Sequence, residues 1–311
     1  MKKLFIAVLL MLAHFGTASA QYEPQYTQYL YNTLVINPAY AGSRGAFSIT
    51  GMHRSQWLGI EGAPKTQTLN FHTPLTERVG IGLSIVNDEI GNGTNQETNF
   101  DGIFSYTIPL ARESKLSFGI KAGAHLLNLD FTKLANYNQE VNPGLINIDN
   151  KFSPNFGIGI YYYNESFYAG LSVPNFLKTQ HFDDSNSSNS FLETERFNMY
   201  FMTGYVYELN PRLQFKPALL LRAAQGTPLQ IDISTTFLIN EKFTLGAAYR
   251  WNAVLSAMLG FQINDNLMLG LAYDREISEL GASTFNDGSF EVLLRYEFLT
   301  RFQRRLTPRF F

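Results

Sequence analysis

The chain has 311 residues, a formal net charge of −2 and no cysteine, which excludes a disulfide framework and a cysteine-linked lipid anchor and gives no sign of nucleic-acid binding. Charged residues make up only 16% and aromatic residues 14%, so the chain is apolar and aromatic without forming long hydrophobic blocks. Because all-β barrels often exceed about 200 residues as one unit, this length is compatible with a single domain.

Residues 1–20 have the layout of a cleaved secretory signal peptide. Lysines at positions 2 and 3 precede an apolar run over residues 4–12, and the segment closes on Ala-Ser-Ala at residues 18–20. An uncleaved anchor is the alternative, but the run is shorter than the roughly 18 apolar residues that span a bilayer, and no later stretch reaches that length. An exported chain of this kind can still enter a membrane as a closed β-barrel, in which every backbone group is paired.

Residues 21–45 precede the first predicted strand and contain five tyrosines. The Asn-Pro step at residues 37–38 and the Ala-Gly pair at 41–42 mark a turn. A tyrosine offers a large apolar ring with a polar tip, which suits docking. We interpret this stretch as a periplasmic or plug segment that docks a partner, with a simple periplasmic lead-in as the alternative. The candidate partner-binding residues are Tyr26, Tyr29, Asn37, Pro38 and Tyr40.

From residue 46 onward, alternation of apolar and polar residues predicts fourteen β-strands. The clearest hairpin covers residues 154–176, where Phe156, Ile158 and Ile160 alternate with glycine and polar residues. Pro217 interrupts one strand and should lie at an irregularity, because proline cannot donate to a sheet ladder. The predicted strands are 46–57, 65–75, 79–88, 97–109, 115–128, 154–164, 166–176, 194–208, 212–223, 228–239, 242–250, 253–263, 266–276 and 288–298.

The links between these strands differ in length in a regular way. Links after even-numbered strands are tight and polar, as in Asn164-Glu165-Ser166, whereas most links after odd-numbered strands are longer. An outer-membrane barrel that starts in the periplasm has this arrangement, with short periplasmic turns and long extracellular loops. We therefore predict an all-β transmembrane antiparallel barrel of about fourteen strands over residues 46–298. A secreted β-sandwich or propeller, whose strands also alternate, is the alternative.

One face of the predicted strands carries both basic and acidic residues, which fits a polar lumen. Because both signs occur, we expect internal ion pairs rather than a strongly ion-selective pore. Glycines at 80, 82, 157 and 159 either line a passage or permit close packing. Trp57 and Trp251 fall at strand ends beside odd-to-even links, where an aromatic girdle would lie. The candidate lumen-facing residues are Lys121, His125, Lys216, Arg222, Asp232, Arg250, Asp274, Glu291 and Arg295.

Several short motifs are spread over the mature chain. They are Gln25-Tyr26-Thr27-Gln28-Tyr29, Asn32, Asn37-Pro38-Ala39-Tyr40-Ala41-Gly42, Arg54-Ser55-Gln56-Trp57, Gly62-Ala63-Pro64 and Pro154-Asn155-Phe156-Gly157-Ile158-Gly159. Together they resemble the PorP/SprF family of outer-membrane proteins, which is associated with type IX secretion and gliding motility in Bacteroidota. The resemblance implies a fourteen-stranded barrel without a known catalytic role. It also implies partners, either the periplasmic core of the secretion machinery or one exported surface protein.

The chain departs from a simple barrel at its C-terminus, where residues 299–311 form a basic tail after the last predicted strand. Either Phe298 or Phe311 could close that strand. On the periplasmic side the tail could meet an acidic partner or anionic headgroups, or it could be a solvated extension. The candidate partner-binding residues in the tail are Arg301, Arg304 and Arg305.

No arrangement of residues indicates chemistry. The four histidines after residue 20 show no metal-ligand spacing, and no G-x-S-x-G elbow occurs. Acidic loop residues at 183–184 and 286–288 could meet calcium but lack the spacing of a calcium hand. We predict no catalytic, cofactor-binding or metal-binding residue. The expected function is that of a non-enzymatic accessory of type IX secretion at the cell surface, and the alternative is a diffusion channel for small apolar or amphipathic solutes.

Overall fold

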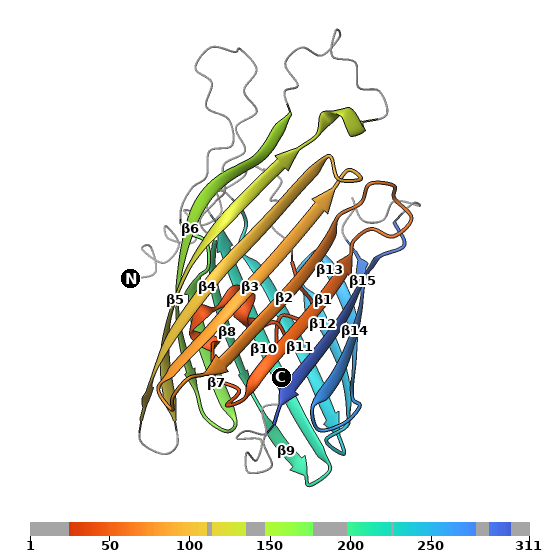
Figure 1. Ribbon diagram of the computed structural model, residues 1–311. Coiled ribbons are helices and arrows are strands. Elements are labelled where there is room, and N and C mark those ends of the chain that lie inside the picture. Colours follow the sequence, from red (N-terminus) through yellow and green to blue (C-terminus); the bar gives the residue numbers. More distant parts are fainter. Residues whose placement is uncertain are drawn as a thin grey trace, which may run out of the picture.

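The computed structural model describes residues 25–110, 114–134, 147–176, 198–224, 227–277 and 286–299. These residues form a closed antiparallel β-barrel of fourteen strands around an N-terminal segment (Figure 1). Each strand pairs with the next in sequence, and the last strand returns to the first through the pairing of Phe298 with Phe47. The predicted fold class is confirmed, and an open sandwich is excluded because the sheet has no free edge.

The strand bounds follow the predicted ones closely. They are β1 (Phe47–Ser55), β2 (Lys65–Pro74), β3 (Val79–Ile90), β4 (Asn95–Pro109), β5 (Lys115–Leu129), β6 (Ile148–Tyr163), β7 (Phe167–Val173), β8 (Asn198–Tyr205), β9 (Tyr207–Asn210), β10 (Leu213–Ala224), β11 (Gln230–Ile239), β12 (Phe243–Arg250), β13 (Val254–Gln262), β14 (Leu267–Glu276) and β15 (Ser289–Phe298).

The strands β8 and β9 are two halves of one barrel strand that is interrupted at Val206. Both halves pair with β10, but β8 pairs only from Ala218 onward and β9 only up to Phe215. Pro217 therefore lies opposite the interruption, where no ladder bond from its nitrogen is needed. The expected irregularity at this proline is confirmed.

The sixth strand begins at Ile148, not at residue 154 as predicted. Its first residues break the alternation, because Asn150 has a left-handed backbone with φ of 45° and the register with β5 shifts between Leu127 and Leu129. A prediction that relies on strict alternation of apolar and polar residues places the start of the strand after such a bulge.

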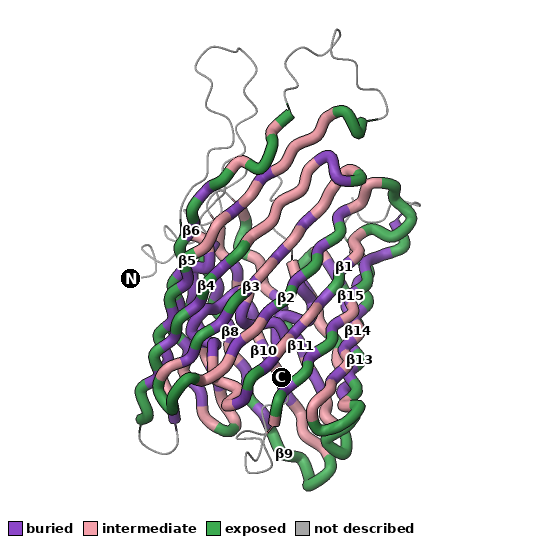
Figure 2. The backbone as a smooth tube through the Cα atoms, viewed as in Figure 1, coloured by how far each residue is buried: buried purple, intermediate pink, exposed green. Residues whose placement is uncertain are grey.

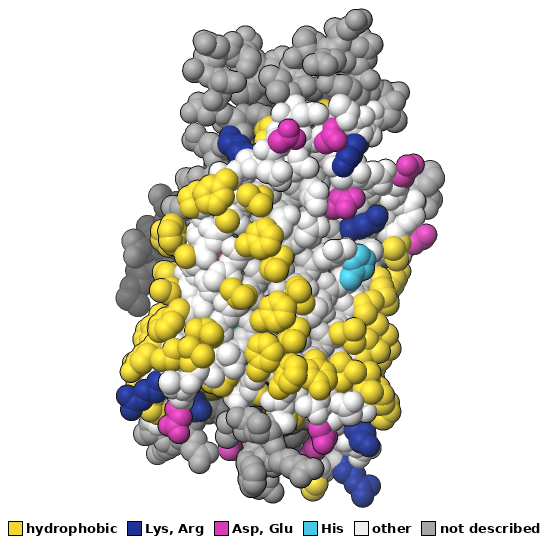
Figure 3. All heavy atoms as spheres, viewed as in Figure 1, with side chains coloured by type: hydrophobic (Ala, Val, Ile, Leu, Met, Phe, Trp, Pro, Cys, Tyr) yellow, Lys and Arg dark blue, Asp and Glu magenta, His cyan; other side chains and the backbone are white. Residues whose placement is uncertain are grey.

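Burial alternates along the strands (Figure 2). The exposed positions carry mainly apolar side chains, the reverse of a soluble barrel. In β6, Phe156 and Ile158 are 53% and 51% exposed, whereas Asn155 before them and Tyr161 after them are buried. Figure 3 shows hydrophobic side chains spread over the visible outer wall, with charged side chains gathered towards its two ends. Such a wall is covered by lipid in a membrane barrel.

The two ends of the barrel differ. At one end, here called the turn end, short turns are closed by backbone bonds such as Asn164 N–H to Phe167 O at 2.9 Å. The other end, here called the loop end, carries the longer links, most of which lie outside the described residues. Trp57 and Trp251 are exposed at the loop end, as expected.

Aromatic pairs also lie at the turn end, where the sequence patterns did not predict them. Ring centroids lie 5.2 Å apart for Phe47 and Phe298, and 4.9 Å apart in each of two further pairs, Phe215 with Phe237 and Phe243 with Phe261. These rings form an aromatic girdle at this end of the wall. Within the described residues Phe298 closes the last strand, and Phe311 lies outside them.

The helical elements in the described residues are short. They are α2 (Thr33–Ile36), η1 (Pro38–Tyr40) and η2 (Phe131–Lys133). Across the described parts of the chain, none is long and apolar enough to cross a membrane. The first two of these elements belong to the segment inside the barrel, described next.

Candidate functional site: the occupied lumen

Residues 25–45, here called the lumen segment, run through the barrel from the loop end to the turn end. At the loop end Gln25 Nε2 donates to Gln230 Oε1 at the start of β11, at 2.9 Å. At the turn end Arg44 binds Glu297, near the end of β15. Between these points Tyr29, Leu34 and the side chains around them are almost fully buried. The segment is seen inside the ribbon of the barrel in Figure 1, in red and orange.

Near the loop end, a carboxylate pair binds the lumen segment through its backbone and one hydroxyl. Glu291 accepts the N–H groups of Thr27 and Gln28, at 2.8 and 2.9 Å, one on each oxygen. Asp274 accepts the Thr27 hydroxyl at 2.7 Å. Arg54 lies between the two carboxylates, 2.6 Å from each. Because one guanidinium balances only one of the two negative charges, the remaining charge favours N–H and O–H donors, and such charge-assisted bonds are strong in a desolvated site.

In the middle of the lumen, the segment contacts opposite walls. Asn32 Nδ2 donates to Thr68 Oγ1 at 3.0 Å, and Asn70 donates to Asn32 Oδ1. The ring of Tyr31 lies under two cations, with Lys216 Nζ and Arg295 Cζ each 5.7 Å from its centroid. Cations at this distance are attracted to the face of the ring. The segment thus offers an aromatic face to basic side chains that β10 and β15 direct inwards.

A row of glycines makes room for the turn at residues 37–39. A Cβ atom added at Gly119 would overlap the backbone of Ala39, and one added at Gly159 would overlap the side chain of Asn37. Asn37 is fixed in this position, because its Nδ2 donates to Ile160 O at 3.1 Å and its Oδ1 accepts from Ala39 N at 3.0 Å. The close approach of backbone to wall requires glycine on β5 and β6.

The same explanation covers one of the other glycines noted in the sequence, because a Cβ at Gly80 would overlap the carbonyl of Ala41. At Gly82 the tightest contact of an added Cβ would be Phe71 O at 3.0 Å, in the barrel wall. Gly157 likewise approaches the carbonyl of Pro174, which belongs to the barrel wall. Close packing, and not a passage, accounts for these positions in this conformation.

At the turn end, the segment is fixed before it enters β1. Arg44 forms a two-point ion pair with Glu297, with Nε to Oε1 at 2.6 Å and Nη2 to Oε2 at 2.9 Å. Gly42 N–H donates to His72 Nδ1 at 3.2 Å, so this imidazole nitrogen acts as an acceptor. The Ser105 hydroxyl donates to Ala41 O at 2.8 Å. Both ends of the lumen segment are therefore bound to the wall by charged groups.

The structure places the candidate residues of the segment inside the barrel. Tyr26, Tyr29, Asn37, Pro38 and Tyr40 are all buried. Their polar partners belong to the wall, as for Asn37, or their rings pack on it, as for Tyr40 and Tyr161 at 5.6 Å. In this conformation they do not present an exposed docking strip, and their partner binding stays a prediction. The candidate tail residues Arg301, Arg304 and Arg305 lie outside the described residues.

The candidate lumen residues all lie on the buried, inner side of their strands. Several form ion pairs or hydrogen bonds across neighbouring strands: Asp232 with Arg250 at 3.0 Å, and Lys121 with Asp101 at 2.7 Å. His125 Nδ1 lies 2.8 Å from Asn99 Oδ1. The buried set is Lys121, His125, Lys216, Arg222, Asp232, Arg250, Asp274, Glu291 and Arg295. Within the described residues, no group of three or more His, Asp or Glu side chains is placed to hold a metal ion.

The sequence reading missed Arg44 and Arg54 as site residues. Arg54 has the same parity on β1 as Thr50 and Met52, which face inwards, so parity alone could have placed it in the lumen. Arg44 lies before the first strand and carries no such signal. Its role depends on the turn at residues 41–45, which brings it back against β15.

A closed sheet with an apolar outer wall, an aromatic girdle and a polar, occupied interior defines an outer-membrane β-barrel. The family model for the type IX secretion system membrane protein PorP/SprF matches residues 18–296. The chain therefore belongs to the PorP/SprF family and lies in the bacterial outer membrane. No curated protein matches the sequence significantly.

Solved barrel structures resemble the chain at low identity. The outer membrane protein Omp33 of Acinetobacter baumannii is 9% identical, with a TM-score of 0.46 over 81% of this chain and 98% of that one. The CymD monoaromatic hydrocarbon channel is 10% identical, with a TM-score of 0.49 over 88% and 94%. The toluene transporter TodX of P. putida is 11% identical, with a TM-score of 0.48 over 86% and 94%.

Proposed function

We propose that this protein is a non-enzymatic accessory of type IX secretion that acts by binding an exported surface protein, the periplasmic secretion machinery, or both. Membership of the PorP/SprF family supports a role in this system. The observation that carries the binding role is the lumen segment, which occupies the barrel from Gln25 to Arg44 and is bound to the wall at both ends. A barrel filled by its own chain is better suited to hold a partner than to pass solutes.

Binding can be tested by capturing the protein from cells after chemical cross-linking. We expect a large exported surface protein or periplasmic secretion components to co-purify with it. Deletion of residues 299–311 should weaken capture of the periplasmic components, because an acidic partner would then have no basic tail to bind. The barrel should remain heat-modifiable on gels. Capture that is unchanged by this deletion would refute the role of the tail. Absence of any secretion component or exported protein would refute the proposal as a whole.

The lumen segment can be tested in the same assay. Replacing residues 37–40 by alanine and glycine removes the contacts that seat the segment on β5 and β6. We expect secretion of the partner to fall while the barrel still reaches the membrane. Normal secretion with normal barrel levels would show that the segment has no part in the function.

A diffusion channel for small apolar or amphipathic solutes is the alternative function. It requires the lumen segment to move aside, with the loss of the Arg44–Glu297 ion pair or of the bonds to Glu291. Uptake of such solutes into liposomes by the intact protein would favour the channel, and its absence together with co-purified partners would favour the accessory role.

A further inference from the structure

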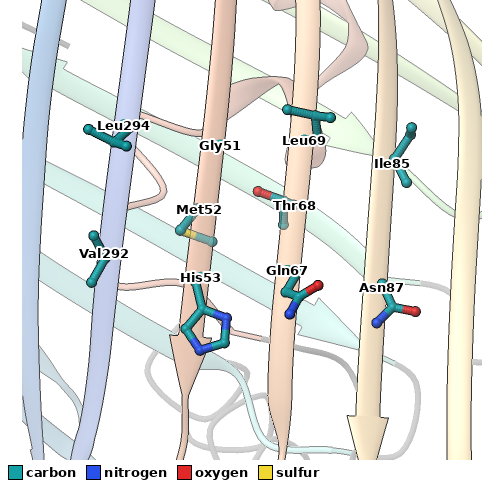
Figure 4. Close-up of a pocket in the computed structure, with 10 residues that line it drawn as sticks. All are labelled: Gly51, Met52, His53, Gln67, Thr68, Leu69, Ile85, Asn87, Val292 and Leu294. Carbon is teal, nitrogen blue, oxygen red and sulfur yellow. The ribbon is translucent and has the colours of Figure 1, made fainter.

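A groove of about 430 Å³ opens on the outer wall over β1, β2, β3 and β15. It lies where Gly51 replaces a side chain in an otherwise apolar row: Gly51 pairs with Leu294 on one side and Leu69 on the other, and Leu69 pairs with Ile85. Figure 4 shows Gly51 bare between these apolar side chains. A Cβ added at Gly51 would meet nothing within 4 Å. Packing among the described residues therefore gives no reason for glycine here, in contrast to the glycines that face the lumen segment.

A polar row borders the groove on the side of the loop end. His53, Gln67 and Asn87 are in register on three neighbouring strands, two residues along each strand from the apolar row. Figure 4 shows them side by side on the same face. Polar side chains on a lipid-facing wall are costly unless they find hydrogen-bonding partners. Three such residues in one row beside an apolar groove form an amphipathic site.

The chemistry of this row favours a ligand with acceptor oxygens. Asn87 Oδ1 already accepts from Thr98 Oγ1 at 2.9 Å and Gln96 Nε2 at 3.1 Å, so its amide hydrogens are the groups left to the groove. His53 Nε2 lies 3.1 Å from Ser55 Oγ, which leaves its Nδ1 for the groove. Gln67 can also donate, and the row contains no carboxylate. The next residues towards the loop end, Lys65 and Glu89, are opposite each other in the register of β2 and β3, so their charges offset each other. Phosphate oxygens suit a row of donors of this kind.

We propose that this groove binds a lipid of the outer leaflet, with an acyl chain over Gly51 and phosphorylated headgroup oxygens at His53, Gln67 and Asn87. The orientation supports this ligand, because the apolar part of the groove points towards the middle of the wall and the polar row towards the loop end. That is the direction in which an outer-leaflet lipid places its headgroup. The ligand class is lipid A, the phosphorylated glycolipid of that leaflet, and the site is independent of the lumen and of the proposed function.

Native mass spectrometry of the detergent-purified protein with added lipid A tests the site. We expect the wild type to retain lipid A and Gly51→Leu to reduce retention by about tenfold, because the new side chain excludes a few methylene groups of the acyl chain. The double variant Gln67→Leu, His53→Leu should weaken binding similarly, because it removes donors but leaves the groove open. Gly102→Leu is the matched control, since Gly102 is exposed on the same wall and its Cβ would meet only Ala122 O at 3.7 Å.

Heat-modifiability of every variant on gels confirms that the barrel is folded. Retention by Gly51→Leu equal to that of wild type and Gly102→Leu would overturn the proposal. Equal retention of phosphatidylethanolamine in the same titration would also overturn it, because the site would then not recognise the phosphorylated glycolipid. A wild-type dimer that is lost in Gly51→Leu would identify a second copy of the chain as the occupant and would equally overturn it.

Discussion

At the scale of single residues, the lumen depends on charges that are paired across strands distant in sequence. Arg54 on β1 binds Asp274 on β14 and Glu291 on β15. Glu291 in turn accepts the backbone N–H groups of Thr27 and Gln28, and Asp274 accepts the Thr27 hydroxyl. A buried carboxylate pair without its cation would be strongly unfavourable. Arg54 thus stabilises both the wall and the seat of the lumen segment.

Replacing Arg54 by Met tests this arrangement. We expect the free energy of unfolding in urea, measured with lipid vesicles, to fall by about 3–5 kcal/mol, because two buried carboxylates lose their cation. Glu291→Gln is the informative partner variant, since it removes one of the two negative charges and retains one acceptor for the segment. We expect it to cost less than Arg54→Met. A change below about 1 kcal/mol for Arg54→Met would show that the cluster is hydrated and weak.

Parity along the strands indicates which residues share a face, but not which of them pair. Lys121 and Asp232 are buried, on the face opposite the apolar wall, because side chains alternate in a strand. Their partners, Asp101 and Arg250, depend on the register between neighbouring strands, which is set by turns and bulges that one sequence does not specify.

At the scale of elements, the barrel strands and the lumen segment differ in how far they could be predicted. The strands have a period of two and polar turns, so most bounds agree within a few residues. The lumen segment has no regular period, and its helical elements α2 and η1 have four and three residues. Its position depends on glycines at 119, 159 and 170 that become neighbours only when the barrel closes.

Filling this glycine row should release the lumen segment. We expect Gly119→Leu to displace the turn at residues 37–39, because its side chain would occupy the space of Ala39. Residues 25–45 should then become sensitive to protease in the folded, detergent-solubilised protein. Gly102→Leu, on the neighbouring strand β4 but facing outwards, should leave the segment protected. Equal protection in both variants would mean that the segment is not seated on this row.

At the scale of the whole molecule, the lumen segment fixes the direction of the N-terminal part of the chain. Gln25 lies at the loop end, although β1 starts at the turn end. In a barrel with periplasmic turns, the loop end faces the outside of the cell. The segment therefore traverses the thickness of the membrane once, inside the barrel, before β1 crosses it.

The chain has no native cysteine, which allows this topology to be measured directly. We expect Gln25→Cys to react with a membrane-impermeant thiol reagent on intact cells. Thr76→Cys, in an exposed turn at the turn end, should react only after the outer membrane is permeabilised. The opposite labelling pattern would show that the turn end, and not the loop end, faces the outside of the cell.

A barrel of fourteen strands is wide enough to need an occupant, since about eight strands suffice for side chains alone to fill the interior and about 16 leave an aqueous channel. Single-channel recording in planar bilayers therefore tests the central claim most directly. The intact protein should show no steady open state, and deletion of residues 25–44 should produce one. Steady conductance of the intact protein at the level of the deletion variant would contradict a filled lumen and the binding role that rests on it.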